Sequence, residues 1–429
     1  MFKNLVRFIY AILTYSLLPF YVCFWIAKGI KNKSYWDRIK QRFGFGYPIL
    51  NEGTIWIHAV SVGEVQASAP LVKAIQTRYP DKEILVTTVT PTGSHQVQKN
   101  FKNSVYHCYI PFETSFSIKA FFDAVKPSIA LILETEIWPN LYNECGARKI
   151  PLVLVSARIS IKSMKSYKRL LPLFRETLSH GILIAAQSNV DAKRFISLGA
   201  DKDKTWVMGN IKFDFNLPLD MNIKGLDLKS KEFGDRPVWI AASTHEGEEL
   251  EILKAHREIL KTIRNMLLII VPRHPERFAQ VEQLLIKEKW SYTKRSSKQP
   301  AADICEVFLL DSIGELLFFY SASDIAFVGG SLLPVGGHNL LEPASLGLPI
   351  LTGMHMFNQQ EMTDLFIEAS AAKIVKDKTE IIEHVLFLHN NKEVSKNIGA
   401  RAKKIVEENK GALDSLMRRL DRILAERIN

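Results

Sequence analysis

Cysteine is scarce in this chain of 429 residues. The four cysteines, Cys23, Cys108, Cys145 and Cys305, stand far apart and form no C-x-x-C pair. Their spacing excludes a zinc ribbon and a disulfide framework, and it fits a reducing compartment. Internal repeats and low-complexity tracts are also missing, and there is one long uncharged apolar run. A fibrous, disordered or polytopic membrane protein is therefore excluded.

Several catalytic signatures are absent from the sequence. It contains no G-x-x-x-x-G-K-[ST], no H-E-x-x-H and no G-x-S-x-G, which argues against P-loop nucleotide hydrolases, zinc proteases and α/β-hydrolases. No D-x-D metal cluster follows a predicted strand. Asp201-Lys202-Asp203 has those letters but lies in a helix-to-strand connection, where we expect it to be solvated. We therefore expect no metal and no other cofactor.

Acidic residues are fewer than basic ones. The chain has 45 Asp and Glu against 56 Lys and Arg, which gives a net charge of +11. A basic chain favours an anionic partner such as a phosphorylated lipid, a membrane surface, a nucleotide or a nucleic acid. No nucleic-acid-binding module is recognisable, so a nucleic acid is not expected.

The long apolar run extends from Phe8 to Ala27, FIYAILTYSLLPFYVCFWIA. At about twenty residues it is long enough to cross a bilayer core, too long for a signal peptide, and followed by no small-residue cleavage site. Residues 1–33 are therefore predicted to be an uncleaved membrane anchor with a basic flank, either spanning or embedded. More Lys and Arg follow the run than precede it, which places the rest of the chain on the cytoplasmic side.

Residues 35–45, YWDRIKQRFGF, mix aromatic and basic side chains. Such a segment can lie on anionic headgroups or form a short amphipathic helix that packs on the following domain. The sequence leaves both arrangements open.

After Asn51, short apolar runs alternate with helical stretches, the pattern of a parallel sheet covered on both faces. The first series is TIWIHAVS, EILVTTVT, SVYHCYI, SIALILET, PLVLVSA and GILIAAQ; the second is VWIAAST, LLIIVPRH, CEVFLLDS, DIAFVGGS, PILTG and AAKIV. We expect an α/β fold of two doubly wound, Rossmann-like domains facing a cleft. Their predicted limits are 34–212 and 238–429 with a linker at 213–237, and the last helix can cross back to the first domain.

Charged residues follow several predicted strands of the first half, where ligands of such sheets bind. Glu64 falls in a first helical turn, either as a carboxylate that the helix dipole favours or as a general base. Glu134 and Glu136 end a strand and should point to opposite sides, as catalytic groups or as a capping network. Lys212 can meet a phosphate or carboxylate, although spacing alone favours a solvated linker lysine.

The second half has its own strand-end motifs. Arg273 and His274 precede Pro275, a helix-start signal, and can face an anion there. Ile313-Gly314-Glu315 opens another helix. The glycine-rich stretch 329–353 predicts a backbone nest for a phosphate, and Glu342 is placed to accept ribose hydroxyls.

These motifs resemble, in the family's order and along most of the chain, those of the 3-deoxy-D-manno-octulosonic acid (Kdo) transferases of lipid A assembly. The matching segments are HAVSVGEV, PTGSHQV, YIPF, ETEIWPN, SARIS, GNIKFD, VPRHPERF, IGEL and GGSLLPVGGHNLLEPASLGLPILTG. The resemblance implies a GT-B glycosyltransferase with an acceptor domain followed by a donor domain. It also implies inverting, metal-independent transfer of Kdo from CMP-Kdo to lipid IVA at the bacterial inner membrane.

The resemblance further implies residue roles. Glu64 matches the general base, and Glu134 and Lys212 match positions that stabilise the transition state. The CMP-binding positions are matched by Pro272, Arg273, Ile313, Gly314, Glu315, Asn339, Leu340, Leu341 and Glu342. Two alternatives stay open: a UDP-sugar-dependent GT-B lipid glycosyltransferase, and a non-catalytic, membrane-tethered nucleotide-binding scaffold. A basic face with Lys162, Lys165, Lys168 and Arg169 is expected to meet anionic lipid or to be merely solvated.

Overall fold

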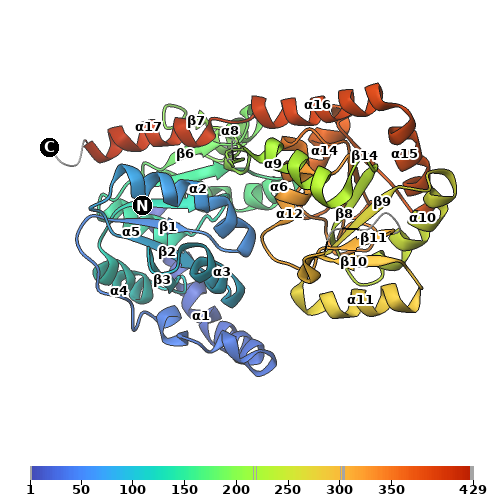
Figure 1. Ribbon diagram of the computed structural model, residues 1–429. Helices are drawn as coiled ribbons and strands as arrows, with labels where there is room; N and C mark the ends of the chain where they lie inside the picture. Colours follow the sequence, from blue (N-terminus) through green and yellow to red (C-terminus); the bar gives the residue numbers. More distant parts are fainter. Residues whose placement is uncertain (1, 216, 219, 300, 302–304, 426–429) are drawn as a thin grey trace. The chain divides into compact units, whose positions relative to one another are not determined.

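The chain folds into two compact units (Figure 1) in a computed structural model that describes residues 2–215, 217–218, 220–299, 301 and 305–425. Side chains of residues 2–5, 161 and 162 are not described, so Lys162 of the expected basic face lies outside the described side chains. Unit 1 comprises Met1–Phe215 and Asn409–Asn429, and unit 2 comprises Asn216–Glu408.

Unit 1 contains a seven-stranded parallel sheet within its described residues, in the order β3-β2-β1-β4-β5-β6-β7. The strands are β1 (Thr54–His58), β2 (Ile84–Thr88), β3 (Tyr106–Tyr109), β4 (Pro127–Leu133), β5 (Leu152–Ala157), β6 (Leu183–Ala186) and β7 (Thr205–Val207). The strand order reverses between β1 and β4, so the loops that follow these two strands diverge and leave room for a ligand.

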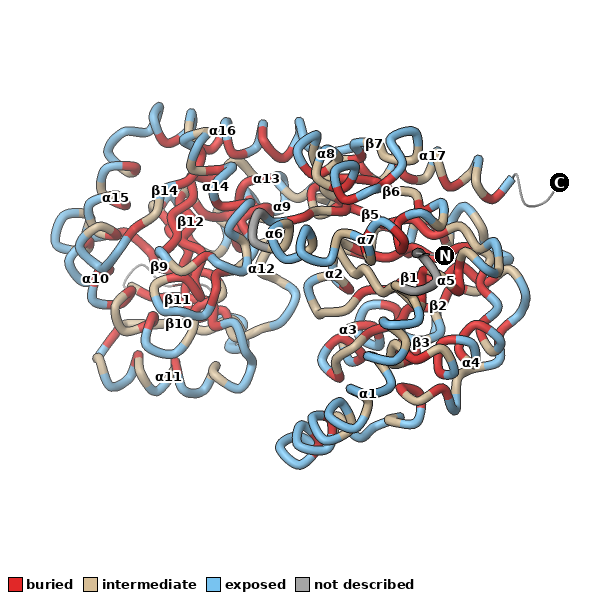
Figure 2. The backbone as a smooth tube through the Cα atoms, turned by 180° about the vertical axis from the view of Figure 1, so that it is seen from behind, coloured by how far each residue is buried: buried red, intermediate tan, exposed pale blue. Residues whose placement is uncertain are grey.

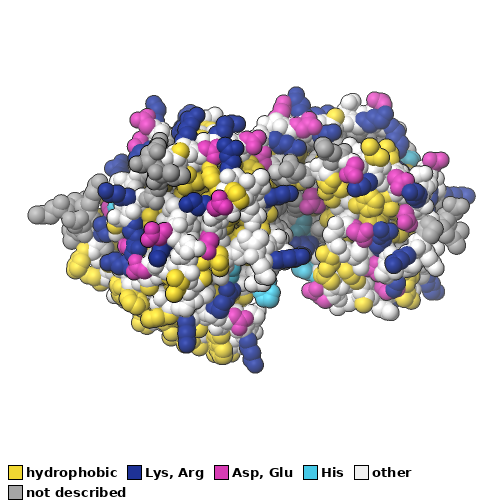
Figure 3. All heavy atoms as spheres, turned by 60° about the vertical axis from the view of Figure 1, so that its left-hand side comes forward, with side chains coloured by type: hydrophobic (Ala, Val, Ile, Leu, Met, Phe, Trp, Pro, Cys, Tyr) yellow, Lys and Arg dark blue, Asp and Glu magenta, His cyan; other side chains and the backbone are white. Residues whose placement is uncertain are grey.

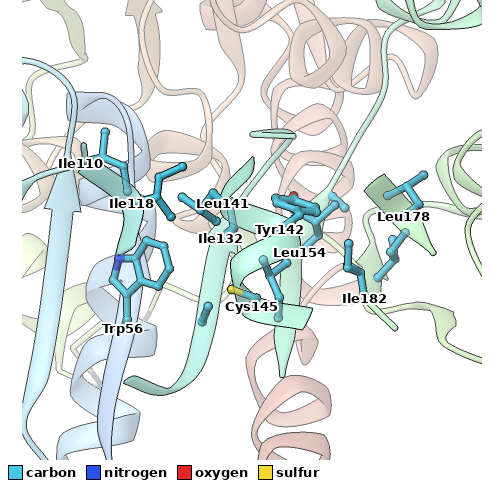
Figure 4. Close-up of a cluster of buried hydrophobic side chains, with 14 of the residues drawn as sticks. Trp56, Ile110, Ile118, Ile132, Leu141, Tyr142, Cys145, Leu154, Leu178 and Ile182 are labelled. Atoms are coloured by element: carbon cyan, nitrogen blue, oxygen red, sulfur yellow. The ribbon is translucent and has the colours of Figure 1, made fainter. Parts of the chain in front are cut away.

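Helices cover both faces of this sheet (Figure 2). They are α2 (Val62–Arg78), α3 (Pro91–Phe101), α4 (Ser115–Val125), α5 (Pro139–Ala147), α6 (Ile161–Arg169), α7 (Leu171–Leu178), α8 (Asn189–Ser197) and α17 (Ala412–Ala425). Because side chains alternate along a strand, Trp56 packs in one core and Ile55 and Ile57 pack in the other. Figure 4 shows the first core, where Trp56, Ile132 and Tyr142 come from strands and helices far apart in sequence.

The final helix belongs to unit 1. Its buried residues Leu416, Leu420 and Leu424 recur every four positions and join the core that includes β1 and α2. Asp214 accepts the N–H groups of Gly411 (2.6 Å) and Leu413 (2.7 Å) at the start of α17. Unit 2 therefore ends at Glu408 rather than at residue 429, and the last helix returns to unit 1, which the sequence prediction had left open.

Unit 2 also holds a seven-stranded parallel sheet among its described residues, in the order β10-β11-β9-β8-β12-β13-β14. Its strands are β8 (Val238–Thr244), β9 (Leu267–Pro272), β10 (Tyr292–Lys294), β11 (Val307–Leu309), β12 (Ile325–Val328), β13 (Ile350–Thr352) and β14 (Ala372–Ile374). The order reverses between β8 and β12. Two doubly wound sheets confirm the expected fold class.

The helices of unit 2 are α9 (Met221–Leu228), α10 (Glu248–Thr262), α11 (Phe278–Lys287), α12 (Leu316–Ser321), α13 (Leu341–Ser345), α14 (Gln360–Glu368), α15 (Lys378–Asn390) and α16 (Lys392–Glu408). The segment expected to be a linker, 213–237, is mostly folded: α9 and the π-helical turn Lys229–Phe233 lie within it. Leu228 and Phe233 are buried in a core of unit 2. Burial of these two side chains stabilises a segment whose sequence lacks an amphipathic period.

Helix α1 (Phe2–Lys31) contains one 26-residue stretch, Val6–Lys31, that is long and apolar enough to cross a membrane. It nevertheless contacts the rest of unit 1 near both of its ends. Arg7 forms an ion pair with Glu176 of α7 (3.6 Å), and the Trp25 ring lies 6.3 Å from that of Phe112. Its other faces remain exposed, and Figure 3 shows hydrophobic side chains gathered along the lower edge of the unit that carries it.

Residues 35–45 pack on unit 1. They form a short 3₁₀ helix, Ile39–Phe43, in which Gln41 and Arg42 are buried. The guanidinium of Arg42 lies 3.7 Å from the centre of the Trp25 ring and 4.3 Å from that of Tyr109. Stacking between two aromatic rings holds this cation inside the fold, so the segment packs on the domain, as one of the two expected arrangements has it.

Candidate active site

Glu64 lies in the first turn of α2, directly after β1. Ser61 caps the helix by accepting the N–H of Glu64 (3.4 Å). In return, the Glu64 carboxylate accepts the N–H of Val60 (2.8 Å) and the hydroxyl of Ser61 (3.0 Å). This capping box fixes the side chain at the carboxyl edge of the sheet. Burial, supported by the nearby charges of Glu134 and Glu136, raises the pKa of Glu64 to about 7 although both hydrogen bonds oppose the shift.

A pKa near neutrality is what a general base requires. A carboxylate can act as a base only when it is ionised, so the role expected of Glu64 predicts that kcat/KM falls about tenfold per pH unit below pH 7. The raised pKa also implies that ionisation of Glu64 lowers the free energy of unfolding as pH rises from about 4.5 to about 7. A pH–rate profile of wild type measures the first effect. A flat profile between pH 5 and 8 contradicts this role.

Glu134 is the centre of an ion-pair network. Its carboxylate lies 2.8 Å from Nζ of Lys212 and 3.3 Å from Nε of Arg158. Burial alone raises the pKa of Glu134, but the two cations outweigh it and hold that pKa below its usual value. Glu134 is therefore ionised at neutral pH, whereas Glu64 is poised to take up a proton. Two carboxylates with opposed pKa shifts are typical of acid–base sites.

Glu134 and Glu136 follow the strand rather than belonging to it, so the alternation expected of an extended chain does not apply to them. Strand β4 ends at Leu133, and Glu134 has a left-handed φ of +56°, which ends the alternation of side chains. Both carboxylates come near enough to Glu64 to raise its pKa. Glu136 accepts the indole N–H of Trp138 (2.7 Å).

Lys212 is not a solvated linker lysine. It lies in a short 3₁₀ helix, Ile211–Phe213, capped by the side chain of Asn210. An irregularity in β5 gives Ser156 a φ of +55°, and its hydroxyl accepts the N–H of Ile211 (3.2 Å). This bond between β5 and the turn sets the position of Lys212.

Arg158 and Ser156 were missed in the sequence. A cue was available, because both lie in SARIS at the end of a predicted strand, where ligand-binding residues concentrate.

The second group of predicted residues lies at the carboxyl edge of the sheet in unit 2. Exposed Arg273 follows β9, and its N–H donates to the carbonyl of Thr244 (3.0 Å). Asn339 accepts the N–H of Leu341 (3.0 Å), and its amide lies 3.5 Å from Glu342. Burial raises the pKa of Glu342, and Asn339 and Arg273 oppose the shift. The fold thus places Arg273, which follows β9, close enough to Glu342 in α13 to affect its pKa.

The remaining predicted positions differ in exposure and in their partners. Pro272 ends β9 and is buried, and Leu340 and Leu341 are 0% and 2% exposed. Gly314 has a φ of +90°, and Ile313 beside it is exposed. Glu315 pairs with Arg295 (2.9 Å), whose hydrogen bond lowers the pKa of Glu315.

The glycine-rich loop does not offer its first N–H groups to a ligand. Those of Gly330, Ser331 and Leu332 donate to the carboxylate of Glu248, at 2.7, 2.8 and 2.8 Å. Glu248 is 0% exposed and also accepts the N–H of His245 (2.9 Å). A carboxylate from α10 therefore occupies the nest that the sequence predicted for a phosphate. The glycines allow close backbone approach, but Glu248 shapes the loop.

We expect Glu248→Gln to weaken CMP binding and to lower the free energy of unfolding by about 1–3 kcal/mol, because an amide cannot accept all of these bonds. Thermal denaturation and calorimetric titration with CMP measure both effects. The control is Glu251→Gln on the same helix, whose exposed carboxylate pairs with Lys254. Equal CMP affinity in the two variants contradicts the role given to Glu248.

Three histidines surround Arg273 and were not assigned as a group from the sequence. Nε2 of His245 lies 2.8 Å from Nε2 of His338, and the His245 and His274 ring centres are 5.4 Å apart. Burial, then Arg273, lowers the pKa of His338 to about 4. His338 is thus neutral at pH 7 and contributes ring nitrogens rather than charge. Each histidine follows a strand or a glycine pair, which is the signal that could have identified the group.

Among the described residues, no group of three or more His, Cys, Asp and Glu side chains is arranged to hold a metal ion.

Comparison with known proteins identifies relatives for both units. The family profile described as 3-deoxy-D-manno-octulosonic-acid transferase (kdotransferase) matches residues 37–215. A 3-deoxy-D-manno-octulosonic acid transferase of Haemophilus influenzae is 41% identical over 96% of this chain and 97% of its own length. The C-terminal CMP-Kdo binding domain of WaaA from Acinetobacter baumannii is 35% identical, covering 44% of this chain and 99% of that domain, with a TM-score of 0.43.

A crystal structure of a glycosyltransferase from Rickettsia africae shares the fold. It covers 87% of this chain and 98% of its own, at 14% identity and a TM-score of 0.53.

Proposed function

The chain belongs to the 3-deoxy-D-manno-octulosonic acid (Kdo) transferase family, and we propose that it transfers Kdo from CMP-Kdo to lipid IVA with inversion. The observation that carries this proposal is the placement of two carboxylates at the point where the strand order of unit 1 reverses: Glu64 in the capping box after β1, and Glu134 in the ion pair with Lys212 after β4. Such a pair suits the activation of a sugar hydroxyl.

Glu64 acts as the general base. Its ionised carboxylate takes the proton from the attacking hydroxyl of the acceptor, whose oxygen forms a bond to the anomeric carbon of Kdo. The bond from that carbon to the phosphate oxygen of CMP breaks, and CMP leaves with the electron pair. Attack on the face opposite the leaving group inverts the configuration. Glu134 and Lys212 stabilise the charges of the transition state, and Lys212 keeps Glu134 ionised.

CMP binds to unit 2 through Arg273, the backbone of 313–315 and the segment Asn339–Glu342. Arg273 is the exposed cation among them and faces the phosphate, and Glu342 accepts ribose hydroxyls. CMP leaves with one phosphate, so protein donors suffice to stabilise it without a metal ion. Exposed Lys165, Lys168 and Arg169 at the end of α6 attract the phosphates of lipid IVA.

We place the protein at the bacterial inner membrane through α1, with both units on the cytoplasmic side. The excess of Lys and Arg after the apolar run supports this orientation. Contacts of Arg7 and Trp25 with the same folded unit favour an embedded α1 that lies along the membrane surface over one that spans it. A spanning helix would separate these residues by about 27 Å across the bilayer.

The proposal is tested by incubating the full-length protein in detergent with radiolabelled CMP-Kdo and lipid IVA, and in parallel with UDP-sugars. We expect Kdo transfer and no transfer from the UDP-sugars. Transfer from a UDP-sugar alone supports the alternative donor class, and no transfer from any donor supports a non-catalytic scaffold.

A further inference from the structure

A cavity of about 470 Å³ lies between α1 and the rest of unit 1. Leu13, Leu17 and Leu18 of α1 form its outer wall, and Phe112 and Trp138 belong to the inner wall, in loops after β3 and β4. The volume falls within the range of about 300–1,000 Å³ that is typical of small-molecule sites. The lining by aliphatic and aromatic side chains favours an apolar ligand.

The cavity is accessible along α1. Leu13, Leu17 and Tyr21 line it and are still 51%, 39% and 52% exposed. The same helix exposes Phe8, Phe20 and Phe24 on its outer faces, as a helix embedded in a membrane interface would. A lipid chain can therefore enter from the acyl region of the membrane without crossing water.

The inner wall of the cavity adjoins the catalytic carboxylates. Trp138 lines the cavity and donates its indole N–H to Glu136. Glu136 lies close enough to Glu64 to affect its pKa. The side chain of Trp138 thus lies between an apolar chain bound in the cavity and the carboxylate of Glu136.

Two charged residues line the cavity, and the protein satisfies most of their polar atoms. Glu113 accepts the N–H groups of Asn140 and Leu141, each at 3.0 Å. Arg42 is 1% exposed and donates to the carbonyl of Val89 (2.6 Å). Within the described residues, Nε of Arg42 has no hydrogen-bond partner, so an ester or amide oxygen that reached it would satisfy a buried donor.

We infer that this cavity binds one acyl chain of the lipid acceptor while the accepting sugar hydroxyl lies at Glu64. The inference rests on the proposed function and adds that the protein recognises an acyl chain of the acceptor as well as its sugar. Each methylene buried in such a site strengthens binding by about fourfold, so acceptor affinity should depend on chain length.

The test uses full-length protein in detergent and two acceptors with the same disaccharide bisphosphate, one carrying long acyl chains and one carrying short chains. Leu18→Trp fills the cavity from α1, and Ile12→Trp is the matched control because Ile12 is on α1, 51% exposed and outside the lining. We expect Leu18→Trp to raise KM for the long-chain acceptor at least tenfold and to leave KM for the short-chain acceptor within twofold. Ile12→Trp should change neither value.

An equal effect of Leu18→Trp on the two acceptors, or no effect on either, overturns the inference. Leu18→Ala enlarges the cavity without adding bulk and should retain the chain-length preference, which checks that the tryptophan acts by filling space. The wild-type protein tests the proposed function separately. If it transfers Kdo to both acceptors with the same KM, the transferase activity is supported and the acyl-chain site is contradicted.

Discussion

Replacing Glu64 with glutamine should lower kcat for Kdo transfer by about 10²–10⁴-fold, because the amide keeps the size of the side chain but cannot take a proton. CMP binding should be unchanged, since the residues assigned to CMP lie in unit 2. Single-turnover transfer measures the first quantity, and calorimetric titration with CMP measures the second. The alanine variant should lose transfer to the same extent.

Glu380→Gln is the control variant for the loss of the capping hydrogen bonds that Glu64 makes. Glu380 lies in the first turn of α15 and accepts the N–H of Lys376 (3.0 Å), as Glu64 accepts that of Val60 (2.8 Å). Both substitutions disturb a capping box, so both should lower the melting temperature slightly. A similar loss of transfer in the two variants, or full activity of the Glu64 variant, removes Glu64 from the mechanism.

The second large effect is expected for Lys212→Met, which should lower kcat by about 10²–10³-fold, the usual loss when one preorganised charged donor is removed. Lys212 is the nearer of the two cations at Glu134, at 2.8 Å. Without it, the pKa of Glu134 should rise, and the pH–rate profile should shift together with the loss in kcat. Initial rates at saturating acceptor between pH 5 and 9 measure both.

Lys202→Met serves as the control, because Lys202 is exposed in a turn between α8 and β7. Lys212→Arg keeps the charge and should recover part of the activity. If Lys212→Met retains wild-type kcat, the ion pair with Glu134 is structural only.

The apolar runs of the sequence predicted the long strands and the doubly wound class because buried parallel strands need continuous Val, Ile, Leu and Ala. Strands β7 and β10 were missed. Each is three residues long and lies at the edge of a sheet, so Thr205–Val207 and Tyr292–Lys294 carry no such run. The period of leucines in α17 predicts a helix but does not specify the core against which it packs.

Motif spacing placed Glu64, Glu134 and Arg273 after strands, and the structure brings the first two close together. Motif spacing could not show that Lys212 pairs with Glu134, because 78 positions separate the two residues. Their contact depends on a hydrogen bond between Ser156 and Ile211. The glycine loop was misjudged for a related reason. Glycine permits a nest, but whether a phosphate or the protein's own Glu248 fills it depends on how α10 packs.

The amino-acid order alone determined the class of fold, the family and the apolar character of the N-terminal helix, because each follows from local patterns of hydrophobicity and short motifs. The tertiary structure decided which charged side chains form ion pairs and hydrogen bonds with one another. Only folding brings Lys212 and Arg158 to Glu134, Glu248 to the glycine loop, and α1 alongside a cavity whose lining residue Trp138 bonds to Glu136. The pKa of a carboxyl group depends on burial and on charges a few ångströms away, and neither is encoded in the neighbours of a residue along the chain.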